Sequence, residues 1–85
     1  MNISKDVLPQ YFATYDIFLS SVLLSLNFTL DRLDRTNPRK VQFIFQKITG
    51  LDEAVQAYWD KTLRLEPQTV LTNLKLLKNR LYSEM

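Results

Sequence analysis

The chemistry open to this chain is limited by the residue types that it lacks. Its 85 residues include no histidine and no cysteine, so the commonest general base, a thiolate nucleophile and the commonest metal ligands are all missing. Ser20, Ser21 and Ser25 therefore have no histidine that could activate them for attack. A single glycine also excludes a glycine-rich phosphate loop. We expect a protein that is not an enzyme and that uses no metal and no cofactor.

The basic residues offer a different chemistry, which is contact with phosphate groups. The stretch from Asp31 to Lys40 has the composition of a turn and contains Arg35, Arg39 and Lys40. The forked donors of a guanidinium group match phosphate oxygens, so these three residues are candidates for nucleic-acid binding. The alternative is a solvated turn in which the arginines pair with the neighbouring aspartates.

A second basic group lies near the C-terminal end, where Lys75, Lys78 and Arg80 occur close together. On a helix, Lys75 and Lys78 would lie on one side of the apolar stripe and Arg80 on the other. Nucleic-acid surfaces usually gather their basic residues on one face, so this division of charge weakens the case. Lys75 and Lys78 remain candidates for nucleic-acid binding, and a solvated helix face is the alternative.

Leu76 does not fit the apolar stripe of its segment, which consists of Val70, Leu74, Leu77 and Leu81. On a helix it would lie on the far side of the stripe, together with Thr72 and Arg80. An apolar side chain in that place indicates a second packing contact or a partner surface. We therefore predict a protein–protein contact through Leu76, Thr72 and Arg80, with a homodimer as one form of it.

Two aromatic pairs, Tyr11-Phe12 and Tyr58-Trp59, could stack on nucleic-acid bases. Aromatic residues at strand and helix spacing are more often part of the core. We therefore expect both pairs to be buried.

The apolar run from Ile17 to Leu26 must organise the fold that positions these residues. Thr14 is suited to cap a helix at its start, and Asn27 can end one in the left-handed conformation. The run is apolar on almost all sides, which predicts a helix buried between other elements. It is too short and too interrupted by serine to cross a membrane.

Strands are predicted on both sides of this helix. Residues 10–13 contain aromatic β-formers, so a first strand is possible there. Residues 28–32 alternate apolar and polar side chains, and in residues 41–46 Val41, Phe43 and Phe45 share one face of a strand. A turn with Asn37 and Pro38 lies between the two segments. They should form an antiparallel hairpin. Leu33 breaks the alternation, which indicates a bulge or the end of the inward-facing run.

Two helices complete the predicted chain. Thr49 can cap a helix that begins near Leu51, and Pro67 suits the first position of a helix over residues 68–82. The order strand, helix, strand, strand, helix, helix defines an α+β fold, in which a small sheet is packed by the buried helix and two C-terminal helices. We expect residues 1–9 to form a flexible N-terminal arm and residues 10–85 a single domain.

Four groups of residues together resemble a family of small bacterial proteins, often from mobile elements, known only as a domain of unknown function. The groups are Tyr11-Phe12-x-Thr14-x-Asp16, Asn37-Pro38-Arg39-Lys40-Val41-x-Phe43-x-Phe45, Ala57-Tyr58-Trp59 and Asn73-Leu74-Lys75-Leu76-Leu77-Lys78-x-Arg80-Leu81-Tyr82. That family commonly has a glycine after the central helix, where this chain has Asn27. The resemblance implies the same order of strands and helices, and it implies no catalytic or binding residues.

We therefore predict a small non-catalytic binding domain. The first hypothesis is a protein–protein interaction or self-association module. The alternative is a nucleic-acid-binding accessory protein of a mobile element or phage. The absence of cysteine fits a reducing, cytoplasmic compartment, and we expect neither a membrane nor a small-molecule substrate among the partners.

Overall fold

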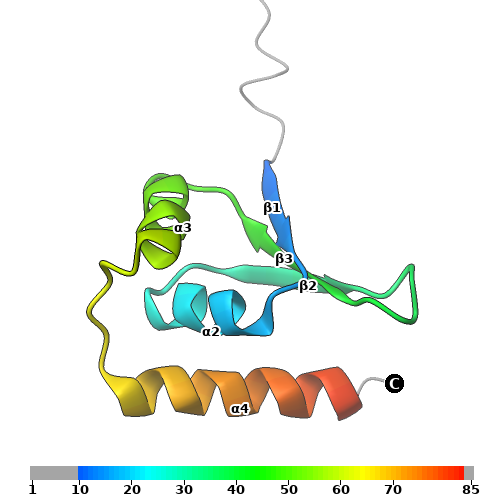
Figure 1. The fold of residues 1–85 in the computed structure, drawn as a ribbon. Coiled ribbons are helices and arrows are strands. Elements are labelled where there is room, and N and C mark those ends of the chain that lie inside the picture. The colour runs from blue at the N-terminus through cyan, green and yellow to red at the C-terminus, as the bar shows by residue number, and fades with distance from the viewer. Residues whose placement is uncertain (1–9, 84–85) are drawn as a thin grey trace, which may run out of the picture.

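The predicted α+β fold is confirmed by a computed structural model, which describes residues 10–83 (Figure 1). The elements follow in the predicted order: β1 (Tyr11–Thr14), α2 (Ile17–Ser25), β2 (Leu30–Asp34), β3 (Gln42–Gln46), α3 (Leu51–Asp60) and α4 (Pro67–Ser83). The arm predicted for residues 1–9 lies outside the described residues.

The three strands form one antiparallel sheet in the order β1-β3-β2. β2 and β3 are the predicted hairpin, and β1 joins the other edge of β3 with Phe12 opposite Phe45. Because β1 runs antiparallel to its neighbour, the sheet needs no parallel crossover.

A bulge in β2 explains the broken alternation of its sequence. The register shifts between Leu30, which lies opposite Phe45, and Arg32, which lies opposite Ile44. The extra residue is therefore Asp31 and not Leu33. Since a bulge adds one residue to one strand, both leucines of β2 can face the side of the sheet that carries the buried Phe43 and Phe45.

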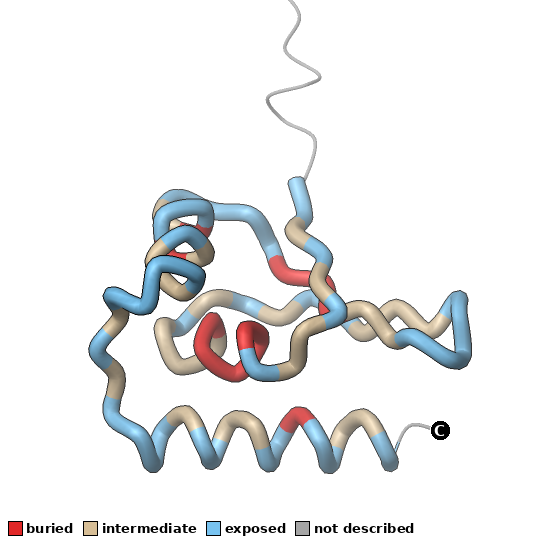
Figure 2. Tube along the Cα trace, viewed as in Figure 1, coloured by how far each residue is buried: buried red, intermediate tan, exposed pale blue. Residues whose placement is uncertain are grey.

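α2 is the buried helix that the sequence predicts. It lies between the sheet and α4 (Figure 1), and the buried residues concentrate on it and on β3 (Figure 2). Leu19 and Leu23 are at most 1% exposed and pack in one cluster with Phe43, Phe45 and Leu51. Phe18 is the exception, since 57% of it is exposed.

The cap of α2 is Asp16, so the prediction of Thr14 is wrong. β1 extends through Thr14, which moves the start of the helix two residues along the chain. The Asp16 carboxylate accepts hydrogen bonds from the main-chain amides of Phe18 (2.9 Å) and Leu19 (3.1 Å). The Thr14 hydroxyl supports this turn by accepting from the Asp16 amide at 3.0 Å. The predicted end of the helix is confirmed, because Asn27 has a φ of 70°.

The serines of α2 allow α4 to pack against it. Each hydroxyl donates to a main-chain oxygen of the helix or of its cap residue Asp16, and the Ser25 bond to Ser21 is 2.7 Å long. These buried or half-buried hydroxyls therefore have partners. The Asn73 side chain of α4 then donates to Ser25 Oγ at 2.9 Å, which fixes one helix against the other.

The two C-terminal helices begin differently from each other. Gly50 precedes α3 with a φ of 94° and gives no side-chain cap, so the prediction of Thr49 as the cap is wrong. α4 begins at Pro67, as the sequence predicts, and the Glu66 carboxylate accepts a hydrogen bond from the Thr69 amide at 2.8 Å. Leu77 is the buried residue of the α4 stripe, and Val70, Leu74 and Leu81 are half-buried.

Only one residue of each aromatic pair packs in the core. Phe12 and Tyr58 pack against the core cluster, whereas Tyr11 is 44% and Trp59 is 59% exposed. Neighbouring residues point to opposite faces of a strand and are rotated by about 100° on a helix, so one member of each pair turns outward. The prediction that both pairs are buried is therefore wrong for Tyr11 and Trp59.

Candidate functional site

A cleft of about 590 Å³ lies between the β2–β3 hairpin, the start of α2 and the C-terminal part of α4. Apart from Arg35, its buried and half-buried lining is apolar and includes Ile17, Phe43 and Leu81. In Figure 1 the hairpin turn and the C-terminal end of α4 extend to the same side of the molecule. The hairpin and the last helix therefore form two walls of one site. In the sequence they are two separate basic segments.

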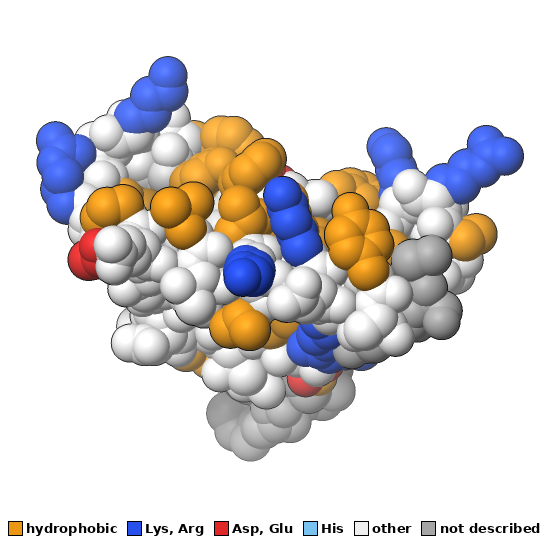
Figure 3. Space-filling view, turned by 90° about the horizontal axis from the view of Figure 1, so that it is seen from below, with side chains coloured by type: hydrophobic (Ala, Val, Ile, Leu, Met, Phe, Trp, Pro, Cys, Tyr) orange, Lys and Arg blue, Asp and Glu red, His pale blue; other side chains and the backbone are white. Residues whose placement is uncertain are grey.

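Three basic residues belong to the exposed lining of this cleft. Arg39 and Lys40 come from the hairpin, and Lys78 comes from α4. Within residues 10–83 none of these three side chains forms a salt bridge, since the ion pairs found there join other residues. Seen from below, basic side chains project at the hairpin end and between apolar side chains along α4 (Figure 3). Three positive charges therefore face solvent around one hollow.

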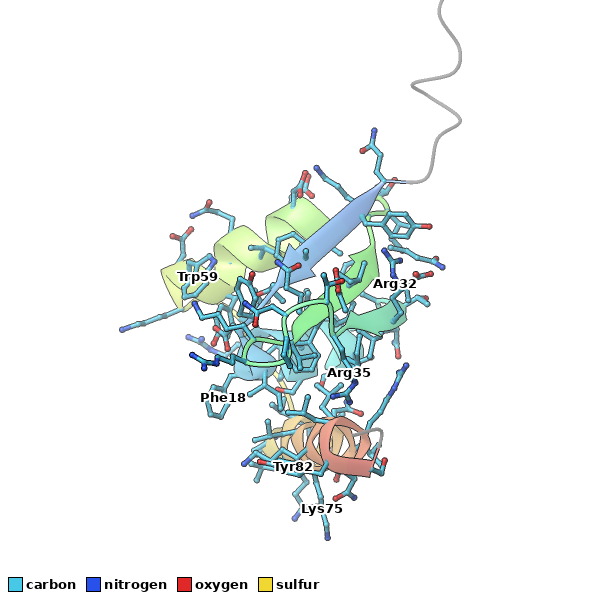
Figure 4. All side chains as sticks on the ribbon, turned by 90° about the vertical axis from the view of Figure 1, so that its right-hand side faces the viewer. Phe18, Arg32, Arg35, Trp59, Lys75 and Tyr82 are labelled. Carbon is cyan, nitrogen blue, oxygen red and sulfur yellow. The ribbon has the colours of Figure 1, made fainter. Side chains whose placement is uncertain are left out.

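Arg35 holds the two walls of the cleft together. Its Nη2 donates to the main-chain oxygen of Leu81 at 2.8 Å and lies 3.4 Å from that of Arg80. These carbonyl groups belong to the last turns of α4, where helix carbonyls lack partners within the helix and favour a positive charge. Figure 4 shows Arg35 between the hairpin and α4. Arg35 therefore positions the other basic residues as well as lining the site.

Two exposed tyrosines flank the basic residues. Tyr15 is 54% exposed and Tyr82 is 66% exposed, and both line the cleft. The Lys40 ammonium group lies 5.1 Å from the centre of the Tyr15 ring, which is within the range of a cation–π contact. Sequence reasoning missed Tyr15. Its place in the short link between a strand and a helix cap was the signal available, since functional side chains concentrate in such connections.

A smaller hollow of about 300 Å³ adjoins the cleft, because Tyr15 and Lys40 line both. Its remaining lining is polar and includes Asp34, Asn37 and Gln42. Asp34 accepts a hydrogen bond from the Thr36 amide at 2.9 Å. The hydrogen bonds from Thr36 lower the pKa of the Asp34 carboxyl, so the carboxylate is charged at neutral pH.

Most of the residues predicted for nucleic-acid binding line this one cleft, namely Arg35, Arg39, Lys40 and Lys78. Lys75 does not line it and projects from α4 away from the rest of the molecule (Figure 4).

The residues predicted for a protein partner lie elsewhere on α4. Leu76 is 57% exposed and Thr72 is also exposed, whereas Arg80 is half-buried. The positions three and four residues from Leu76 are Thr72, Asn73, Asn79 and Arg80. These positions are its neighbours on the helix surface, so α4 offers Leu76 no second apolar residue on that side.

Other kinds of site have little support in the part of the chain that the structure describes. Residues 10–83 contain no group of three or more acidic side chains that could hold a metal ion. Among the helices of the same region, none has the length and apolar character that a membrane crossing requires.

Fold and site together define a small α+β domain with a basic cleft flanked by tyrosines. The chain belongs to the family described as Domain of unknown function (DUF5659), whose model matches residues 9–83. The resemblance to a domain of unknown function is therefore confirmed. No curated protein sequence and no solved structure matches the chain.

Proposed function

We propose that this domain binds nucleic acid through the cleft between the β2–β3 hairpin and α4. The observation that carries the proposal is the convergence of Arg39, Lys40 and Lys78 on one hollow, without acidic partners among residues 10–83. Basic side chains grouped on one surface beside exposed aromatic rings are the usual features of a nucleic-acid site. The two basic segments of the sequence contribute to one site, which favours nucleic-acid binding over two solvated surfaces.

The shape of the site also fits a chain of phosphates better than a small anion alone. The apolar side chains of Ile17, Phe43 and Leu81 line the same hollow as the cations. They provide a surface for sugars and bases, and the cations contact the backbone. Half or more of protein–nucleic acid hydrogen bonds go to phosphate and sugar groups, so we assign Arg39, Lys40 and Lys78 to that role.

The strength of binding should depend steeply on salt concentration. Neutralising each phosphate releases counterions, with a slope in log K against log salt of about −0.7 for single strands and −0.9 for duplexes per contact. Three cations therefore predict a slope of about −2 to −3. The test is fluorescence anisotropy of a labelled oligonucleotide, titrated with the domain from about 50 mM salt upward.

Single substitutions locate the site. Arg39→Ala and Lys78→Ala should each reduce the magnitude of the salt slope by about 0.7 to 0.9. Arg32→Ala is the matched control, because it also removes one positive charge. Arg32 lies opposite Ile44 on the other face of the sheet, beside Asp31 and Tyr11. Absence of binding at about 50 mM salt, or equal effects of the three substitutions, would refute the proposal.

Self-association through α4 is the second candidate function, and the exposure of Leu76 favours it. An exposed leucine on its own is common in monomers, and its helical neighbours are polar. Sedimentation of the domain at increasing concentration tests this candidate. A dimer that Leu76→Glu dissociates would support it, and a strict monomer would exclude it.

The proposed setting is the cytoplasm of a bacterium, as an accessory protein of a mobile element or phage. The resemblance of the sequence to small proteins of that kind supports this setting. This proposed setting is separate from the proposal about the cleft, because nucleic-acid binding by the purified domain does not depend on the organism or the compartment.

A further inference from the structure

We propose that the cleft selects single-stranded over duplex nucleic acid, with a base stacked on Tyr15 and its phosphate held by the surrounding cations. The inference rests on the proposed function, because it names the form of nucleic acid that the same site takes. It adds two features to the general proposal, which are the tyrosines as stacking surfaces and the smaller hollow.

The exposure of the tyrosine rings is the first observation. Tyr15 and Tyr82 are more than half exposed while they line a cleft with a largely apolar base. An aromatic ring binds a base through its face, and the base faces of a duplex are covered by their neighbours. Only unpaired bases can be stacked in this way, so these rings favour a single strand.

The arrangement of the two hollows is the second observation. Tyr15 and Lys40 line both of them and therefore stand at their boundary. The Lys40 ammonium group lies over one face of the Tyr15 ring, so a base stacked on the opposite face would bring its own phosphate close to a cation. Arg39 and Lys78 line the larger hollow, so the neighbouring phosphates of the strand would bind to these two cations.

The smaller hollow differs from the larger one because an acidic residue lines it, and this difference indicates which part of a nucleotide lies in each hollow. Its lining includes Asp34, whose charged carboxylate would repel a phosphate. The same carboxylate can accept a hydrogen bond from the amino group of a base edge, and Asn37 and Gln42 lie beside it. We therefore place a base edge in the smaller hollow and the backbone in the larger one.

The experiment compares three labelled ligands of equal length, about 12 nucleotides, which spans the site of a small single-strand-binding domain. They are a mixed-sequence single strand, the duplex of that strand, and an abasic strand with the same number of phosphates. Anisotropy titrations at one low salt concentration give the three dissociation constants. The single strand should bind about ten-fold more tightly than either control, since stacking of one base contributes about that factor.

Two variants of Tyr15 separate stacking from charge. Tyr15→Phe keeps the ring and should bind the single strand as the wild type does. Tyr15→Ala should weaken single-strand binding about ten-fold and leave binding of the abasic strand unchanged. Tyr82→Ala provides a second test at the other side of the cleft. Circular dichroism checks that each variant is folded, which we expect because both tyrosines are exposed.

The outcomes distinguish this inference from the function on which it rests. Equal binding of the single strand, the duplex and the abasic strand, with loss on Lys78→Ala, would overturn the inference and keep nucleic-acid binding. Tighter binding of the duplex would overturn it as well. Failure of all three ligands to bind would overturn both.

Discussion

Arg35 Nη2 lies 2.8 Å from the main-chain oxygen of Leu81 and joins the β2–β3 hairpin to the last turns of α4. The two residues are far apart in the sequence, and their contact determines the relative position of the two walls of the cleft. Arg39 and Lys40 follow on the hairpin side, and Lys78 lies one turn before Leu81 on the helix side. Together with the packing of α4 against α2, this hydrogen bond brings the basic residues of two segments to one site.

Removal of this contact should loosen the end of α4. We expect Arg35→Ala to lower the free energy of unfolding by about 1 to 3 kcal/mol, the usual contribution of a hydrogen bond from a charged group. Hydrogen exchange of the last two turns of α4 should accelerate, and urea denaturation measures the free energy. Arg35→Lys keeps the charge without the forked donors, and we expect an intermediate value. Unchanged exchange in α4 on Arg35→Ala would show that the contact does not hold the helix.

The contact between α2 and α4 can be measured by a double-mutant cycle. Asn73 Nδ2 donates to Ser25 Oγ at 2.9 Å, and both residues are half-buried. We expect Ser25→Ala and Asn73→Ala to show a coupling energy of about 0.5 to 1.5 kcal/mol in chemical denaturation. Asn79→Ala is the control, because Asn79 is an exposed amide on the same helix and should change stability by less than about 0.5 kcal/mol. A coupling of zero would mean that apolar packing alone joins the helices.

Acid should weaken the start of α4 through Glu66. Hydrogen bonds from the main-chain amides of Gln68 and Thr69 hold the pKa of the Glu66 carboxyl below its ordinary value of 4.5. A lowered pKa in the folded state means that the charged form stabilises the fold. This contribution is complete above pH 4.5 and is lost as the pH falls through the folded-state pKa.

The variant Glu66→Gln removes this titration and nearly preserves the shape of the side chain. Its melting temperature should lie below that of the wild type at neutral pH, and the gap should shrink as the pH falls below 4.5. Differential scanning calorimetry across this range measures both proteins. A gap that stays constant with pH would contradict an ionised cap at Glu66.

Sequence patterns predicted the elements of this fold well because their signals are local. Apolar residues all round the segment from Ile17 to Leu26 indicated a buried helix. The shared face of Val41, Phe43 and Phe45 indicated a strand over residues 41–46. The caps were harder to predict. Thr14 and Thr49 have suitable side chains, but the strand extends through Thr14 and Gly50 takes the left-handed position before α3. Backbone conformation therefore decided between capping candidates of similar propensity.

The site could be predicted only in part, because its assembly depends on tertiary packing. Arg39, Lys40 and Lys78 were recognisable as basic residues in suitable segments. Their convergence was not, since it follows from the packing of α4 against α2 and from the contact between Arg35 and Leu81. Tyr15 gave no periodic signal, because it lies in the short link between β1 and α2.

The most direct test of the account is to map the binding surface on the domain itself. A ¹⁵N-labelled sample is titrated with a single-stranded oligonucleotide, and the shifts of the main-chain amide signals are followed by NMR. We predict that the largest shifts occur at Tyr15, Arg39, Lys40, Lys78 and Tyr82. Shifts centred instead on Leu76 and Thr72, or no shifts at low salt, would contradict the claim that the cleft between the hairpin and α4 is the binding site.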